Sequence, residues 1–278
     1  MTRHVFAAVF LAAASAACST AVSGEVVEVQ EEKRFAAGAD ADVEVRTFDG
    51  AIEVRSWDRD EVRVEITRRS GSRPDAEALE VRATQEGSRI LVEAVNPAEQ
   101  SPTIRLGPAS RSVSLIVTTP ARLARLQART GDGAISARDV SAAVGLHTGD
   151  GPIRAERVTG SLAANTGDGD VSLLDVQGPV EVHSGDGVIE VAGLLDGLLV
   201  DTGDGDIRID ARQGSVMKGD WVVNTGDGPI SLRLPAGSCQ VIFRPRDSIS
   251  RQKSTTHSRF RIAVRSWNGK FTAPRSRW

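Results

Sequence analysis

One four-residue motif recurs at a fixed interval along the second half of the chain. It reads Thr-Gly-Asp-Gly from positions 130, 148, 166, 202 and 225, and Ser-Gly-Asp-Gly from position 184. The starting positions from 130 to 202 are evenly spaced, and only the last step, from 202 to 225, is longer. A short fixed period is typical of stacked structural units that each contact only their neighbours. The repeat predicts a solenoid, and it favours a binding or scaffold role over catalysis.

Apolar residues hold fixed places within each period. The fifth residue after the Thr or Ser is apolar in every copy, from Ile135 to Ile230, and the seventh is small or apolar. Positions 14 and 16 repeat this pattern in the second half of the period. Alternation with a period of two indicates short strands, so each period holds two of them. We expect an all-β chain: a parallel β-solenoid of 18-residue, two-strand coils whose strands pair about 4.8 Å apart.

The glycines of the motif are expected to form one corner of each coil. Glycine suits such a corner because it has no Cβ. The Thr or Ser of the motif is expected to hydrogen-bond from one coil to the next. The structural turn glycines are Gly131, Gly133, Gly149, Gly151, Gly167, Gly169, Gly185, Gly187, Gly203, Gly205, Gly226 and Gly228.

Weaker copies of the motif flank the regular repeat. Residues 47–54 keep the Thr, Asp, Gly, Ile and Val places, and residues 266–271 keep the Ser and Gly places. Degenerate repeats are expected at both ends of a solenoid, where a cap must block edge pairing. We therefore expect an irregular β region with one degenerate repeat at 40–128, a regular solenoid at 129–243 and a capping segment at 244–278. Within the irregular region, a short helix is expected over 75–83.

The N-terminus has the composition of a processing signal. Arg3 and His4 precede an apolar run that is too short to span a membrane, and small residues follow up to Cys18. Residues 15–18, Ser-Ala-Ala-Cys, resemble the lipobox of bacterial lipoproteins, with Ser15 in the place of the usual Leu. We expect a signal peptide at 1–17, lipidation of Cys18 and a linker at 18–39. The chain is then an outer-membrane or periplasmic lipoprotein, and ordinary secretion is the alternative.

Charge is unevenly distributed along the chain. Residues 244–278 contain ten Arg or Lys and one acid, whereas residues 18–243 contain 23 basic and 36 acidic side chains. The tail is therefore a basic segment on an acidic body. Two interpretations stay open: the tail covers and neutralises the end of the solenoid, or it binds an anionic partner such as lipid headgroups or a surface polysaccharide. We do not expect nucleic acid as a partner of an exported chain.

The aspartates of the motif form a column of like charges. Stacked coils place them about 5 Å apart, where neighbouring pairs repel by roughly 1 kcal/mol in water. Each carboxylate can form an Asx-turn in which it accepts a backbone N–H two residues on. The alternative is a Ca²⁺ ladder, as in nonapeptide β-rolls, although the Gly-Gly-x-Gly-x-Asp spacing of those proteins is missing. No other cofactor is expected. The candidate metal ligands are Asp132, Asp150, Asp168, Asp186, Asp204 and Asp227.

The residue before each motif is polar and is expected to face solvent. His147 and His183 lie two coils apart, about 10 Å, so they should not share a zinc ion. His183 and Asp201 lie in adjacent coils and could form an ion pair. The members of this column are Arg129, His147, Asn165, His183, Asp201 and Asn224.

The chain resembles the putative-adhesin family of bacterial β-strand-repeat proteins, a domain of unknown function. The resemblance rests on Asp-Gly-Ala-Ile-Glu-Val at 49–54 with Trp57-Asp58 after it, on Thr119-Pro120 followed by 123–130, and on the Gly-Asp-Gly turns. It covers residues 40 to 273. It implies surface adhesion, and it brings no catalytic residues to this sequence.

We expect a protein that is not an enzyme: an adhesin-like or scaffold β-solenoid at the cell envelope that presents polar faces to a partner. One alternative is a Ca²⁺-dependent binding module that uses the Asp column. Another is a polysaccharide-active β-helix enzyme. Such enzymes need loops that build a cleft, and the regular coils leave room for loops only at 211–220.

Overall fold

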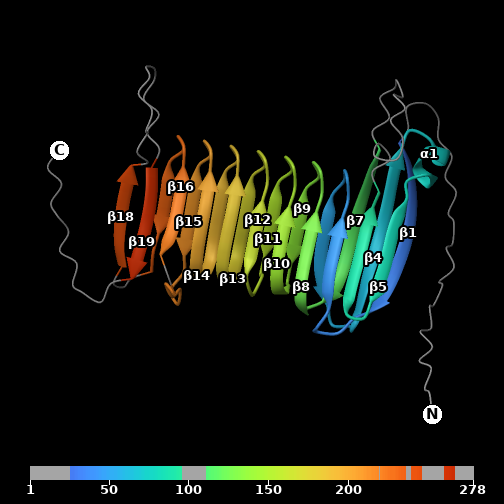
Figure 1. Ribbon diagram of the computed structural model, residues 1–278, viewed down its shortest axis with the longest axis horizontal. Helices are drawn as coiled ribbons and strands as arrows, with labels where there is room; N and C mark the ends of the chain where they lie inside the picture. The colour runs from blue at the N-terminus through green and yellow to red at the C-terminus, as the bar shows by residue number, and fades with distance from the viewer. Residues whose placement is uncertain (1–25, 96–110, 219, 236–238, 246–259, 267–278) are drawn as a thin grey trace, which may run out of the picture.

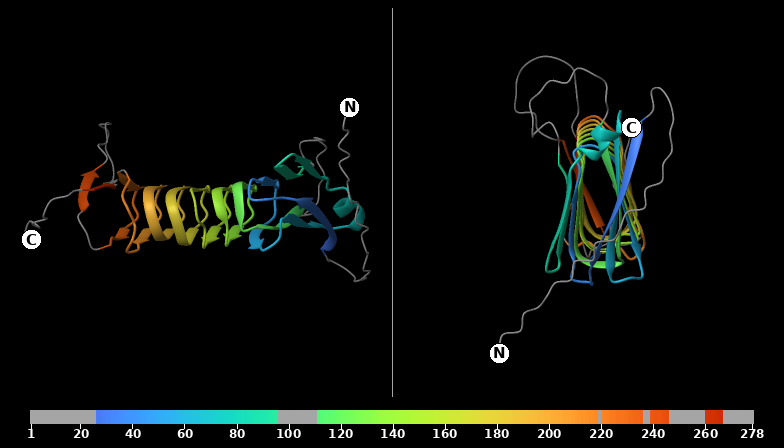
Figure 2. Two further views of the ribbon diagram at one scale, coloured as in Figure 1. Left: turned by 90° about the horizontal axis from the view of Figure 1, so that it is seen from below. Right: turned by 90° about the vertical axis from the view of Figure 1, so that its right-hand side faces the viewer.

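The computed structural model describes residues 26–95, 111–218, 220–235, 239–245 and 260–266. Strands stack side by side into an elongated body, and α1 (Arg73–Glu77) lies at one end of it (Figure 1). Strands make up nearly all of the described secondary structure, which confirms the all-β prediction, and most of their pairings are parallel. Seen along the long axis, the strands outline a narrow, flattened tube (Figure 2).

Two walls of parallel strands form the regular part of this tube. The first wall contains the strands that follow each motif: β9 (Ile135–Arg138), β11 (Ile153–Glu156), the first parts of β13 (Val171–Ser184) and β14 (Ile189–Thr202), then β15 (Ile207–Ala211) and β17 (Ile230–Arg233). The second wall contains the strands that precede each motif: β8 (Arg122–Arg129), β10 (Ser141–His147), β12 (Leu162–Asn165), the second parts of β13 and β14, and β16 (Trp221–Thr225). Ile153 pairs with Ile135 on one side and with Val171 on the other, so its two partners lie one period of the motif before it and one period after it in the sequence.

Side chains of the two walls meet in one continuous apolar core. Alternate residues of each strand point inward, so Ile153 and Ala155 are buried while Arg154 is exposed. Val, Ile and Leu dominate these places, and each such side chain contributes roughly 1.5–3 kcal/mol when it is fully buried. Trp221, which is 1% exposed, occupies an inward place in the last coil of the second wall. Coils are therefore stable only as a stack, because a single coil has no second layer to bury its inner face.

Each Thr of the motif is buried and connects two coils. Thr166 Oγ1 donates a hydrogen bond to the carbonyl oxygen of Gly151 in the preceding coil (2.9 Å) and accepts one from the N–H of Gly169 in its own turn (3.2 Å). Thr148, Ser184 and Thr225 make the same pair of contacts. A buried hydroxyl that lost these partners would carry a desolvation cost of about 1–3 kcal/mol.

The motif glycines allow successive corners to approach closely. A Cβ on Gly167 would fall 2.5 Å from the carbonyl oxygen of Gly149, and one on Gly169 would fall 2.5 Å from the carbonyl carbon of Gly151. The N–H of Gly167 also donates to the carbonyl of Gly149. Glycine is required here by close packing of backbone on backbone, and the described glycines with positive φ lie elsewhere.

The second corner of each coil, opposite the motif, uses a left-handed residue. Asp139, Arg157 and Asp175 have φ of 61°, 54° and 55° and recur with the period of the motif. Arg157 donates through Nε to Asp139 Oδ1 at 2.6 Å, from one coil to the next. Gly160 and Gly178, with φ of 121° and 129°, complete the corner. Left-handed non-glycine residues cost of order 1 kcal/mol each, which this ion pair helps to offset.

The degenerate N-terminal repeat is inserted between two later coils. β2 (Asp42–Arg46) pairs with both β6 (Arg89–Ala94) and β8, and β3 (Ile52–Trp57) pairs with both β7 (Ser112–Pro120) and β9. The blue segment in Figure 1 therefore lies between green strands. Thr130 Oγ1 donates to the carbonyl of Gly50 at 2.8 Å, the same contact that joins the regular coils.

Two expectations for the N-terminal region are wrong. Residues 27–36 of the expected linker form β1 (Val27–Ala36), which pairs antiparallel with β4 (Glu61–Ser70) along its whole length. The pairing partner is distant in sequence, so local composition did not reveal the strand. The helix expected over 75–83 ends at Glu77, and β5 (Val81–Glu86) follows it because these residues pair with β6.

The C-terminal end of the second wall is covered by an antiparallel hairpin. β18 (Cys239–Pro245) pairs with β19 (Phe260–Ser266), and β19 pairs with β16. The domain boundaries expected at 128/129 and 243/244 fall inside β8 and β18, because each of these strands continues across the boundary. Cys18, the expected signal peptide and residues 267–271 of the C-terminal degenerate repeat lie outside the described residues. Within the described residues, no helix is both long and apolar enough to cross a membrane.

Replacing Thr166 with Val should lower the free energy of unfolding by about 1–3 kcal/mol, because the carbonyl of Gly151 and the N–H of Gly169 lose their shared partner. Chemical denaturation of the full chain measures this change. Thr166→Ser is the matched control, since Ser184 occupies the same place in the next coil. Equal stability of the Val and Ser variants would contradict a structural role for the hydroxyl.

Candidate functional site

The motif aspartates form an exposed column along one edge of the tube. All six side chains are exposed. Asp150 Oδ1 lies over Gly167 of the next coil, and the Oδ1 atoms of Asp132, Asp168, Asp186 and Asp204 lie over the corresponding glycines. Each carboxylate therefore packs on a coil corner and faces water, which screens the repulsion between neighbours.

The expected Asx-turns are not formed at Asp132, Asp150, Asp168, Asp186 or Asp204. In the described part of the chain, their carboxylates accept no hydrogen bond from the backbone. The Thr or Ser hydroxyl closes the turn instead, by accepting the N–H of the second glycine. The hydroxyl was expected only as a link between coils, and it also holds the turn of its own coil.

No group of three or more His, Cys, Asp or Glu side chains in the described ranges is arranged to hold a metal ion. The Ca²⁺ ladder therefore stays a prediction about six carboxylates in a single exposed row.

Calcium provides a direct test of this row. We expect the melting temperature of the full chain to be the same in excess EDTA and in millimolar Ca²⁺, because each exposed Asp offers the ion a single side chain. Asp168→Asn should change neither value appreciably. A rise of several degrees in Ca²⁺ that is reduced by Asp168→Asn would establish the cation ladder.

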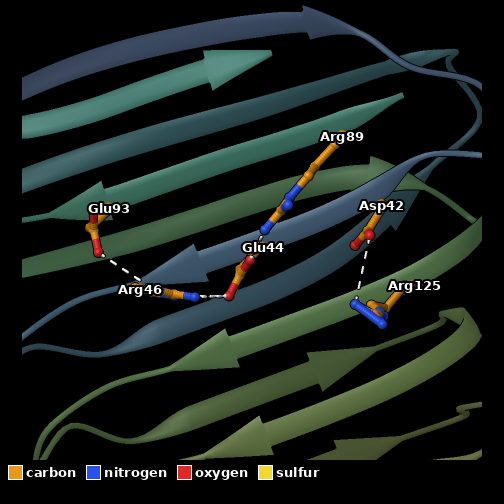
Figure 3. Close-up of polar contacts among 6 residues, drawn as sticks. All are labelled: Asp42, Glu44, Arg46, Arg89, Glu93 and Arg125. Carbon is orange, nitrogen blue, oxygen red and sulfur yellow. Dashed lines mark hydrogen bonds and ion pairs between the residues drawn. The ribbon is translucent and has the colours of Figure 1, made fainter. Parts of the chain in front are cut away.

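A network of ion pairs covers the outer face of the second wall at its N-terminal end (Figure 3). Glu44 of β2 accepts from Arg89 of β6 at 3.0 Å and also from Arg46, which reaches Glu93 at 3.6 Å. Asp42 pairs with Arg125 of β8 at 3.8 Å. Glu44 points outward, yet it is only 8% exposed because the two guanidinium groups lie over it.

Two opposing effects act on the pKa of Glu44. Burial alone raises the pKa. The hydrogen bonds from Arg46 and Arg89 and their positive charges lower it by more than burial raises it, so the pKa lies below its ordinary value. A carboxyl group whose pKa is lower in the folded state stabilises the fold above its unfolded pKa. This stabilisation is lost as the pH falls through the folded pKa.

A shallow hollow of about 760 Å³ follows this network along the same face. It lies over β8, β10, β12, β13 and β14. Its floor consists of small outward residues, among them Ala143 and Gly145 of β10 and Ala163 of β12. Longer side chains rise on both sides, from β8 and from β13 and β14.

Four of the polar side chains that line the hollow have no partner within the described residues. Among the described residues, Gln127, Arg129, His147 and Asn165 make no side-chain hydrogen bond or ion pair. On the far side of the hollow, His183 contacts Glu181 at 3.1 Å and Asn224 donates to Asp201 at 3.0 Å. The ion pair considered between His183 and Asp201 is therefore not formed.

The column of residues before each motif contributes several of these groups. Arg129, His147 and Asn165 occupy adjacent places in the parallel register of β8, β10 and β12. Their surface position was predictable from the sequence, but the hollow beside them was missed. The signal that could have revealed it is the run of small residues at the outward places of two consecutive coils, Ala143, Gly145, Ser161 and Ala163.

Replacing Glu44 with Gln should lower the melting temperature at neutral pH, because Arg46 and Arg89 then lose a charged partner under partial burial. It should also flatten the acid limb of the stability profile below about pH 4.3, the ordinary range of a glutamate. Thermal melts from pH 3 to 7 measure both effects. Glu190→Gln, an exposed change on β14 of the first wall, is the control. Parallel profiles for the three proteins would show that Glu44 does not stabilise the fold.

Comparisons with known proteins identify the fold family. Two similar solved structures are a putative cell adhesion protein from Clostridium sporogenes ATCC 15579 and a putative adhesin from Bacteroides fragilis NCTC 9343. Each is 11% identical with a TM-score of 0.37; they cover 74% and 76% of this chain, and 99% and 97% of their own. A search of the curated proteins gave no match. The expected membership of a family of unknown function is confirmed by the family model described as Toastrack DUF4097, which matches residues 40–263. The chain belongs to the Toastrack DUF4097 family.

Proposed function

We propose that the protein is a non-catalytic, adhesin-like binding module of the cell envelope, and that it holds a surface component against the outer face of its second wall. The observation that carries this proposal is the hollow over β8 to β14, with four polar side chains that have no partner in the described protein. Convergent polar groups around a preformed concavity are what a binding site requires. Paired side chains on either side of the hollow are less available for binding, because a ligand would first have to break their contacts.

The build of the stack supports binding to an extended partner. Each coil is tied to the next by buried Thr or Ser hydroxyls and by strand pairing, so the face is held rigid before a ligand arrives. A preorganised surface loses little conformational entropy on binding. The hollow is also open along one face, which suits a polymer that continues beyond the site.

We further propose that the chain is exported and held at the membrane by lipid on Cys18. The first described residue, Val26, follows Cys18 closely in the sequence. The segment between Cys18 and Val26 spans at most about 30 Å, which would keep the stack close to the membrane surface. The lipid anchor and the hollow are independent parts of the proposal, since the hollow would bind its partner in secreted protein as well.

A bulky residue in the hollow tests the proposed surface. Ala163→Trp should reduce retention of the purified chain on envelope polysaccharide by about tenfold or more, because the indole fills the floor of β12. Ser172→Trp places the same side chain on the outer face of the first wall and should leave retention unchanged. Saturable binding is measured with Cys18→Ser protein to remove any contribution of lipid. Absence of saturable retention, or equal retention of both Trp variants, would refute the proposed surface.

A further inference from the structure

The hollow is a slot that runs parallel to the strands. β8, β10, β12 and β13 are consecutive in the second wall, so the side chains of β8 and β13 stand roughly 14 Å apart, at about 4.8 Å per strand. Between them β10 and β12 present Ala143, Gly145 and Ala163. The slot is therefore wide enough for one extended chain of sugar rings.

One end of the slot is positively charged. Arg129 pairs in register with Arg46 on one side and with His147 on the other. Arg46 already contacts two carboxylates, Glu44 and Glu93, whereas Arg129 is exposed and has no ion pair within the described protein. On the rest of this face Arg46, Arg89 and Arg125 have acidic partners, whereas Arg122, at the far end of β8 from Arg129, has none within the described residues. The guanidinium of Arg129 is thus available to an anion from outside, with Asn165 and His147 beside its position.

The remaining lining groups suit hydroxyls. The side chain of Gln127 lies over Gly145, because a Cβ on that glycine would fall 2.6 Å from Gln127 Oε1. Its amide can both donate and accept, and Ser161 adds a hydroxyl on the β12 side. Two carboxylates also line the hollow: Glu181 of β13, which contacts His183 and lies three strands from Arg129, and Asp220, which directly precedes β16. The cation therefore stands on the β8 side of the slot, and the carboxylates stand on the side of β13 and β14.

We propose that the slot binds an acidic oligosaccharide, with a sugar carboxylate on Arg129 and the hydroxyls of neighbouring rings on Gln127 and Asn165. This inference rests on the proposed function and specifies its ligand class. Arg129 favours a carboxylate because the guanidinium offers two parallel donors to its two oxygens. Hydroxyl-rich rings suit the rest of the slot, because the side-chain amides of Gln127 and Asn165 can both donate and accept hydrogen bonds. The salt dependence of binding should be that of about one ion pair.

The test compares tetragalacturonate with its methyl ester by calorimetry on the full chain with Cys18→Ser. We expect the ester to bind about tenfold or more weakly, since a charged hydrogen bond is worth roughly 1.5–3 kcal/mol. Arg129→Gln should weaken binding of the acid by a similar factor and leave binding of the ester unchanged. Arg154→Gln is the matched control, because Arg154 is exposed and without an ion pair on β11 of the opposite wall within the described residues. Melting curves confirm that both variants are folded.

Each result has a distinct meaning. Equal affinity for the acid and the ester, or equal loss in the Arg129 and Arg154 variants, overturns recognition of the carboxylate. If neither probe binds while retention on envelope polysaccharide still depends on Ala163, the ligand class is wrong and the proposed function stands. If retention is also independent of Ala163, both are wrong. The comparison of acid with ester uses the unaltered slot, so it decides the matter even if Arg129→Gln does not fold.

Discussion

The structure depends on the close stacking of one corner upon the next. At this corner the backbone of each coil lies against that of its neighbour, and a Cβ at either motif glycine would collide with it. The buried Thr hydroxyl then bonds to both coils at once, which satisfies a turn N–H and a carbonyl that burial would otherwise leave without partners. Aspartate fits between the glycines because its carboxylate can pack on the next glycine and still reach water.

The edge strands of a parallel stack must also be protected, since an open edge can pair with another chain. The first wall ends at β1, where inward-facing Lys33 and Glu31 are charged and Glu31 contacts Arg68 at 2.5 Å. Charged inward residues of this kind discourage a further strand. The second wall ends differently at its C-terminal side, where β19 reverses direction and covers β16. Antiparallel strands therefore terminate the first wall at its N-terminal end and the second wall at its C-terminal end.

The outer faces are where the coils differ from one another, because outward residues are free of the packing constraints that fix the core. On the second wall this freedom yields a sequence of environments: the ion pairs around Glu44, then the slot floored by Ala143 and Ala163, then the contact of His183 with Glu181. The first of these stabilises the fold, because it buries a carboxylate beneath two arginines. The second leaves polar groups without partners, which costs little in water and gives the face its capacity to bind.

The sequence alone determined the all-β class, the burial of alternate residues and the Thr contacts between coils, because each follows from a period that local alternation makes visible. It could not place β2 and β3 between β6–β7 and β8–β9, since that insertion joins Ile52 to Ile135 through pairing and no local pattern specifies it. Nor could it find β1, which ends at Ala36 and whose partner β4 begins only at Glu61, beyond two further strands. The repeat already placed Arg129, His147 and Asn165 in one column, but the hollow beside them was found only in the structure. The repeat thus specified the coil, while long-range pairing decided the order of coils and which side chains share a face.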